Sequence, residues 1–140
     1  GKLVFSMYGF RSFEDPEIPV NWTATMTGAY QGTFDTLRIE PYQEGTDIYS
    51  PIYRITGTGS IPDLGSVSVE ITGYLFLTMR LVGYGTNRGH MVYGIYETIG
   101  VITERGFFSG ALYPTTGRFS LRMKSDEGKL YTLSGQNVTP

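Results

Sequence analysis

Residues 66–72 read SVSVEIT, and their apolar and polar side chains alternate one by one. In an extended chain the two valines and the isoleucine fall on one face, and the serine, glutamate and threonine fall on the other. Alternation with a period of two residues is typical of a β-strand that is buried on one side only. Residues 118–124 (RFSLRMK) and 36–40 (TLRIE) repeat the pattern. The sequence therefore predicts sheet structure with one face in a core.

Short turns that contain glycine separate the predicted strands, as at residues 61–65 (IPDLG), 85–89 (GTNRG) and 125–128 (SDEG). Turns of this length join neighbouring antiparallel strands. No window keeps helical spacing of apolar residues over three turns without a glycine or proline. We therefore predict an all-β fold with little or no helix, an antiparallel meander of about 8–10 strands closed or nearly closed as a β-barrel. A two-sheet β-sandwich is the alternative.

The chain has 140 residues, a length typical of a single domain over 1–140 that buries its own core. It has no cysteine, which excludes disulfides and thiolate metal sites and leaves exported and cytoplasmic locations both open. The first residue is Gly1 rather than methionine, so we expect either a processed start, from which a signal peptide can have been removed, or a residue left over from an added sequence.

Charge and motifs exclude several classes of function. The 11 basic and 13 acidic residues are scattered, whereas a nucleic-acid-binding protein carries a basic stripe that contacts phosphates. No apolar run reaches the roughly 18 residues of a transmembrane helix. No phosphate-binding loop, nucleophile elbow or catalytic triad is present. We therefore expect no nucleic-acid partner, no transmembrane segment and no cofactor.

The two predicted strands over residues 74–82 and 90–99 are apolar on both faces. If one face lines the inside of a barrel, a small apolar ligand would bind there, and the other face would need a cover such as a second subunit. We therefore predict a possible homo-oligomer. The predicted ligand-binding residues are Leu75, Leu77, Met79, Met91, Tyr93 and Ile95.

Three residues are weak candidates for catalysis. His90 is the single histidine, and without a second histidine at ligand spacing we predict no metal site. Glu97 and Glu104 lie in apolar, aromatic stretches of the sequence. A carboxylate enclosed by apolar side chains can act as a general acid or base. The alternative interpretation is that both glutamates point outward into water.

Three functions fit these features. The first is a non-enzymatic barrel that binds a small apolar or aromatic ligand inside, an architecture analogous to that of lipocalins. The second is an interaction module whose tyrosines and long loops, over 13–20 and 43–51, contact a protein or a glycan. It requires a filled core and exposed aromatic side chains. The third is a cofactor-free isomerase or cyclase with one buried carboxylate. The sequence favours a protein that is not an enzyme.

Overall fold

The computed structural model describes residues 18–43, 52–65, 68–83, 85 and 88–138. Eight β-strands make up the regular structure of these residues, and no helix is found among them. The strands are β1 (Asn21–Gly28), β2 (Gly32–Gln43), β3 (Ile52–Ser60), β4 (Ser68–Val82), β5 (Gly89–Gly100), β6 (Glu104–Tyr113), β7 (Arg118–Ser125) and β8 (Leu130–Asn137).

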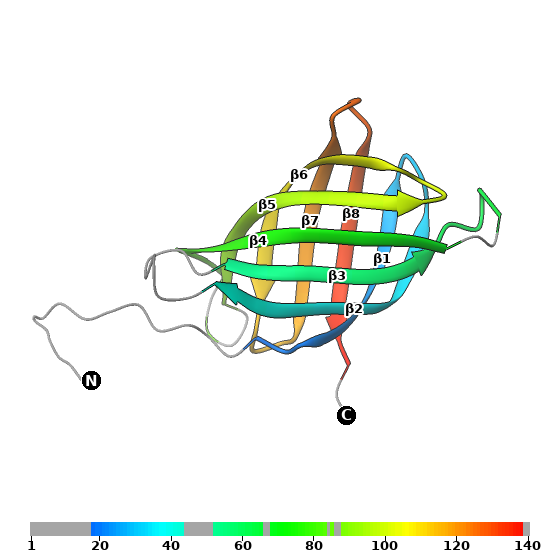
Figure 1. Ribbon diagram of the computed structural model, residues 1–140. Coiled ribbons are helices and arrows are strands. Elements are labelled where there is room, and N and C mark those ends of the chain that lie inside the picture. The colour runs from blue at the N-terminus through cyan, green and yellow to red at the C-terminus, as the bar shows by residue number, and fades with distance from the viewer. Residues whose placement is uncertain (1–17, 44–51, 66–67, 84, 86–87, 139–140) are drawn as a thin grey trace, which may run out of the picture.

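Each strand pairs antiparallel with its neighbours in the sequence, and β1 pairs with β8, so the sheet closes on itself (Figure 1). The predicted antiparallel barrel is confirmed, and the sandwich alternative is wrong because all eight described strands belong to one closed sheet. The sequence predicts residues 66–72 and 74–82 as separate strands. Residues 68–72 and 74–82 belong to one strand, β4, which runs straight through Gly73.

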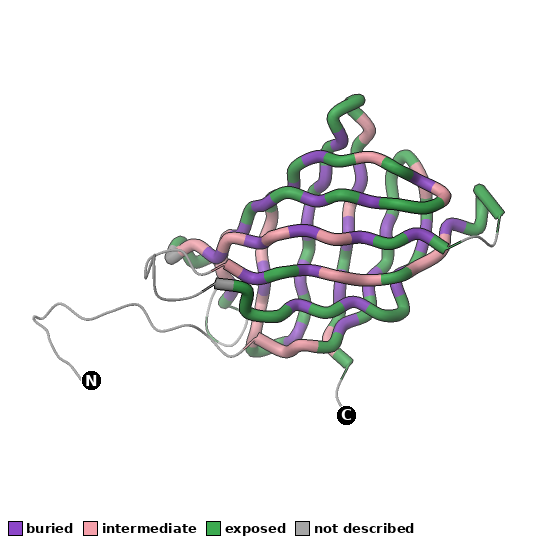
Figure 2. Tube along the Cα trace, viewed as in Figure 1, coloured by how far each residue is buried: buried purple, intermediate pink, exposed green. Residues whose placement is uncertain are grey.

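The core is the inside of this barrel. Along β1, β5 and β7 buried residues alternate with exposed ones, as Figure 2 shows for the whole sheet. Trp22 lies near one end, where its ring packs against Phe119 with centroids 5.1 Å apart and its Nε1–H donates to the Pro19 carbonyl oxygen at 2.6 Å. Ile61 and Ile102, from the β3–β4 and β5–β6 connections, are buried at the other end.

The side chains of β5 that face the interior are not the ones predicted. Leu77 pairs with Val92, and both are buried inside the barrel. Because side chains alternate along a strand, Tyr93 and Ile95 then point outward, and about half of each is exposed (49% and 48%). The expectation that Tyr93 and Ile95 lie on the inner face together with Leu75 and Leu77 is therefore wrong.

We expect the substitution Leu77→Ala to lower the free energy of unfolding by about 3 kcal/mol, because it leaves a cavity in a packed interior. Ile95→Ala on the same hairpin should cost about 1 kcal/mol, because that side chain is already half in water. Urea unfolding of the two variants measures the difference. Equal losses would contradict the assignment of inner and outer faces.

Candidate functional site

Two rows of side chains lie next to each other on the outside of β4, β5 and β6. Residues directly opposite each other in antiparallel strands lie on the same face of a sheet. The register therefore aligns Tyr74, Ile95 and Phe107 as an apolar row. Two residues further along, the same register aligns Thr72, Glu97 and Arg105 as a polar row.

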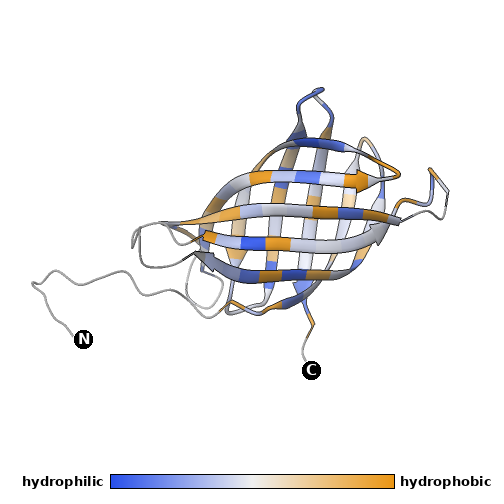
Figure 3. Ribbon diagram, viewed as in Figure 1, coloured by the Kyte–Doolittle hydropathy of each residue, from blue (hydrophilic) through white to orange (hydrophobic). Residues whose placement is uncertain are grey.

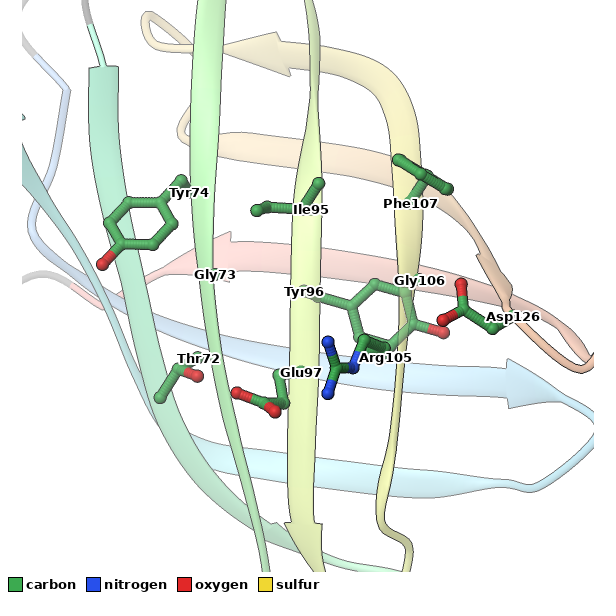
Figure 4. Close-up of a pocket in the computed structure, with 10 residues that line it drawn as sticks. All are labelled: Thr72, Gly73, Tyr74, Ile95, Tyr96, Glu97, Arg105, Gly106, Phe107 and Asp126. Carbon is green, nitrogen blue, oxygen red and sulfur yellow. The ribbon is translucent and has the colours of Figure 1, made fainter.

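A cleft of about 270 Å³ lies between these rows (Figure 4). The rows are two residues apart along each strand, which separates them by roughly 7 Å. Between them the register aligns Gly73, Tyr96 and Gly106, and Tyr96 is buried. Because the side chains at these three positions belong to the inner face, the floor of the cleft is mostly backbone. Asp126, from the β7–β8 turn, also lines the cleft.

Neighbouring rings hold the aromatic side chains of this surface in place. Tyr42 of β2 packs edge-on against Tyr74 with ring centroids 4.8 Å apart. Phe76 and Tyr93 stack with centroids 5.2 Å apart and ring planes 15° from parallel, one row beyond the cleft. Phe107 is the most exposed of the apolar residues in the cleft, at 66%. The apolar wall is therefore already arranged to receive a flat ligand.

The polar wall offers both hydrogen-bond donors and acceptors. Glu97 on β5 lies opposite Arg105 on β6 in the strand register, and both side chains are exposed. Neither forms an ion pair with any described residue, including the other. Asp126 is held next to them because its backbone N–H donates to the Arg105 carbonyl oxygen at 2.9 Å. A second, polar cleft of about 270 Å³ continues from these three residues towards Glu104 and Glu127.

The structure does not bring the predicted ligand-binding residues together. Leu75 and Leu77 are completely buried in the interior, whereas Tyr93 and Ile95 lie on the outer face. Met91 is half-buried. The side chain of Met79 lies outside the described part of the chain, as do residues 13–17 and 44–51 of the two loops proposed for binding. Of the six predicted residues, only Ile95 lines the cleft.

The three catalytic candidates also lie apart. His90 is near the β4–β5 turn, where its Nδ1 lies 3.2 Å from the Thr78 carbonyl oxygen. Glu97 is seven residues further along β5, roughly 23 Å away along the strand, and points outward. Glu104 points inward, and only 7% of its side chain is exposed. Among the described residues no group of histidines and acids is arranged to hold a metal ion, and no helix could span a membrane.

Glu104 belongs to a buried polar cluster with Tyr96 and Tyr131. Burial raises the pKa of both phenols well above the ordinary value, a hydrogen bond with the Glu104 side chain raises that of Tyr131 further, and the charge of the Glu104 carboxylate raises both. The Tyr96 phenol oxygen and Glu104 Oε2 have no hydrogen-bond partner at close range among the described residues. The nearest cation is Lys129, with its Nζ 3.9 Å from that oxygen. A buried polar atom without a partner costs roughly 1–3 kcal/mol, so this cluster is a costly part of the core.

The interior cavities described among these residues are small. One cavity of about 10 Å³ lies beside the polar cluster, and another of about 10 Å³ lies among Ile55, Phe108, Leu121 and Leu133. A volume of about 10–15 Å³ takes a single water molecule. Neither cavity therefore has room for an apolar ligand.

Comparisons with known proteins support the fold. No family model matches the chain, and no curated protein matches it. Among solved structures it is similar to a redesigned β-barrel, mFAP1, in a structure with DFHBI bound. The TM-score is 0.64, the sequence identity is 15%, and the match covers 86% of this chain and 94% of that chain. At this identity the likeness shows that the chain is a small β-barrel of the same architecture.

Sequence reasoning missed most of the cleft. Phe107, Arg105, Thr72 and Asp126 were not considered for binding, because each looks like an ordinary residue of a strand or a turn. Only the register between β5 and β6 places Phe107 beside Ile95 and Arg105 beside Glu97. One signal in the sequence could have revealed part of the cleft. Glu97 and Arg105 are equally far from the turn that joins β5 to β6, and residues placed in this way lie opposite each other in a hairpin.

We expect the free energy of unfolding to fall steeply above pH 10. Tyr96 and Tyr131 keep their protons in the folded protein but lose them in the unfolded chain, where the pKa is about 10. Each such phenol lowers the free energy of unfolding by about 1.4 kcal/mol per pH unit until its folded-state pKa is reached. Tyr131→Phe should remove one of these contributions. Unfolding measured from pH 9 to 11 would contradict the assignment if both proteins showed the same slope.

Proposed function

We propose that the protein is a binding module that recognises a saccharide in the cleft on the outside of β4–β6. The observation that carries this proposal is the cleft itself, with its apolar aromatic wall facing a polar wall across a backbone floor. Of the functions that the sequence allows, this is the interaction module, which requires a filled core and exposed aromatic side chains.

The two walls match the two surfaces of a sugar ring. The C–H groups on the face of a pyranose carry partial positive charge and pack favourably against the negative face of an aromatic ring, such as those of Tyr74 and Phe107. Each hydroxyl on the edge of the ring both donates and accepts hydrogen bonds. Glu97 and Asp126 provide acceptors, and Arg105 provides donors. A wholly apolar ligand would instead bury these charged groups without partners, which is unfavourable.

The size of the cleft suits one sugar ring. Sites for drug-sized ligands usually measure roughly 300–1,000 Å³ and enclose most of the ligand. A cleft of about 270 Å³ on an open surface is at the lower limit and leaves a chain of sugars free to continue beyond it. The polar cleft that continues towards Glu127 offers room for a second ring.

A small apolar ligand inside the barrel is the second candidate. It is supported by the likeness to mFAP1, a barrel of similar architecture that is bound to DFHBI. In this chain such a ligand would have to displace interior side chains, because each interior cavity described measures about 10 Å³. A titration with DFHBI followed by NMR tests this candidate. Interior binding requires large shifts at Leu121 and Leu133, and we expect none.

The saccharide proposal is tested on a broad glycan array with the wild-type protein and two variants. We expect the wild type to bind a defined group of glycans. Phe107→Ala should weaken that binding by about tenfold or more, because an aromatic contact is lost. Leu130→Ala is the matched control, since Leu130 is similarly exposed (62%) but lies in β8, outside the cleft.

Two outcomes would overturn the proposal. One is that the wild type binds no glycan on the array. The other is that Phe107→Ala and Leu130→Ala bind equally well.

Sedimentation of the same three proteins tests the predicted homo-oligomer. A dimer that Phe107→Ala alone dissociates would show that a second copy of the chain occupies this surface.

A further inference from the structure

The outer surface of β6 and β7 carries positive charge next to the apolar wall of the cleft. Lys124 of β7 lies directly opposite Phe107 of β6, and Arg122 lies opposite Ser109, the next outward residue of β6. Both cations occupy outward positions of β7, and both are exposed. Neither forms an ion pair with another described residue. Their charges can therefore meet an anionic group on a ligand that rests on the Phe107 ring.

The strand segments around these two cations contain no acidic residue. Residues 73–96 include no aspartate or glutamate, and neither do residues 106–125, although the whole chain has 13 acidic residues and a net charge of −2. The basic residues of the two stretches are Arg80, Arg88, Arg118, Arg122 and Lys124. Charges that are scattered along the sequence are thus partly separated on the barrel. The acidic side chains of the cleft, Glu97 and Asp126, lie just outside the two stretches.

We propose that the saccharide bound in the cleft is an acidic one, whose carboxylate or sulfate group contacts Lys124 and Arg122. The inference rests on the proposed function, because it concerns the ligand of the same cleft. Glu97 lies one row to one side of Phe107, and Arg122 lies one row to the other side, each roughly 7 Å away along the strands. A sugar stacked on Phe107 can therefore turn its hydroxyls to the polar wall and its acidic group to the two cations.

The aromatic surface continues in the direction of Arg122. The register aligns Phe76, Tyr93 and Ser109 with Arg122 in the next outward row. Phe76 and Tyr93 are stacked with their ring planes 15° from parallel, and Tyr93 is 49% exposed. A chain of acidic sugars that leaves the cleft on this side thus meets a second aromatic surface and a second cation. Repeated stacking and charge contacts of this kind suit a polysaccharide better than a single sugar.

Other charged ligands fit the surface less well. An amino sugar would bring a positive charge towards Lys124 and Arg122, which repel it. An anionic lipid surface would attract these two cations, but it would press its phosphates against the carboxylates of Glu97 and Asp126. An acidic saccharide avoids both conflicts, because each ring carries hydroxyls for the carboxylates as well as an anionic group for the cations.

The test measures binding of the wild-type protein to acidic saccharides and to their uncharged counterparts. The probes are oligogalacturonate and alginate oligomers, each beside its methyl ester, and dextran sulfate beside plain dextran. We expect at least one acidic probe to bind about tenfold or more tightly than its counterpart, because the counterpart lacks the charge-assisted contacts. No preference for any acidic probe would overturn the inference. If neutral glycans on the array still bind, the saccharide proposal stands without it.

The substitution Lys124→Gln tests whether the preference comes from this surface. It should reduce the preference for the acidic probe over its counterpart by about tenfold. Arg38→Gln is the matched control, since it removes one exposed positive charge from β2, outside the cleft. Equal losses in the two variants would overturn the inference, because they would show attraction by net charge alone. Binding to phosphatidylglycerol vesicles, with no binding to any acidic probe, would overturn it in favour of a lipid partner.

Discussion

The pairing of β1 with β8 is the contact on which the rest of the structure depends. It removes both free edges of the sheet, so every strand has a partner on each side. It also divides the side chains into two sets, because a closed sheet has an inside and an outside. The inside of an eight-stranded barrel is just wide enough for side chains to fill it. The two interior cavities described in this chain measure about 10 Å³ each.

The outer surface is not uniform, and the difference follows the strands. The outward residues of β7 and β8 are mostly arginine, lysine, serine, threonine and glutamine. The outward positions of β4, β5 and β6 include Tyr74, Phe76, Tyr93, Ile95 and Phe107. Figure 3 shows hydrophobic residues recurring along β4 and β5. Apolar side chains that gather on one side of a surface in this way are typical of contact surfaces.

Alternation in the sequence was enough to predict the strands and the closed barrel, because a period of two residues is visible in residues such as Val69 and Ile71. It was not enough to predict which face of β5 is buried. Met91, Tyr93 and Ile95 form one apolar set, and Val92, Tyr96 and Thr98 form another. A shift of one residue in the pairing exchanges the two sets. The choice depends on how β4 pairs with β5, which places Val92 opposite the buried Leu77 and which no local pattern reveals.

The same dependence on register explains why the site was harder to predict than the fold. Glu97 and Glu104 look alike in sequence, but Glu97 pairs with outward Arg105, and Glu104 pairs with buried Thr98. One carboxylate therefore lies in a surface cleft and the other in the core. The register between β5 and β6, rather than the residues near each glutamate in the chain, decides between these environments.

Tyr96 connects the two parts of the molecule. Tyr96 lines the outer cleft and both interior cavities. A glycine lies opposite it on each neighbouring strand, Gly73 on β4 and Gly106 on β6. A side chain at either glycine would collide with the backbone of a neighbouring strand, at Ile95 or at Lys124. The close approach of the strands on both sides of Tyr96 thus requires glycine at these two inward positions, and the outer cleft lies over this same part of the sheet.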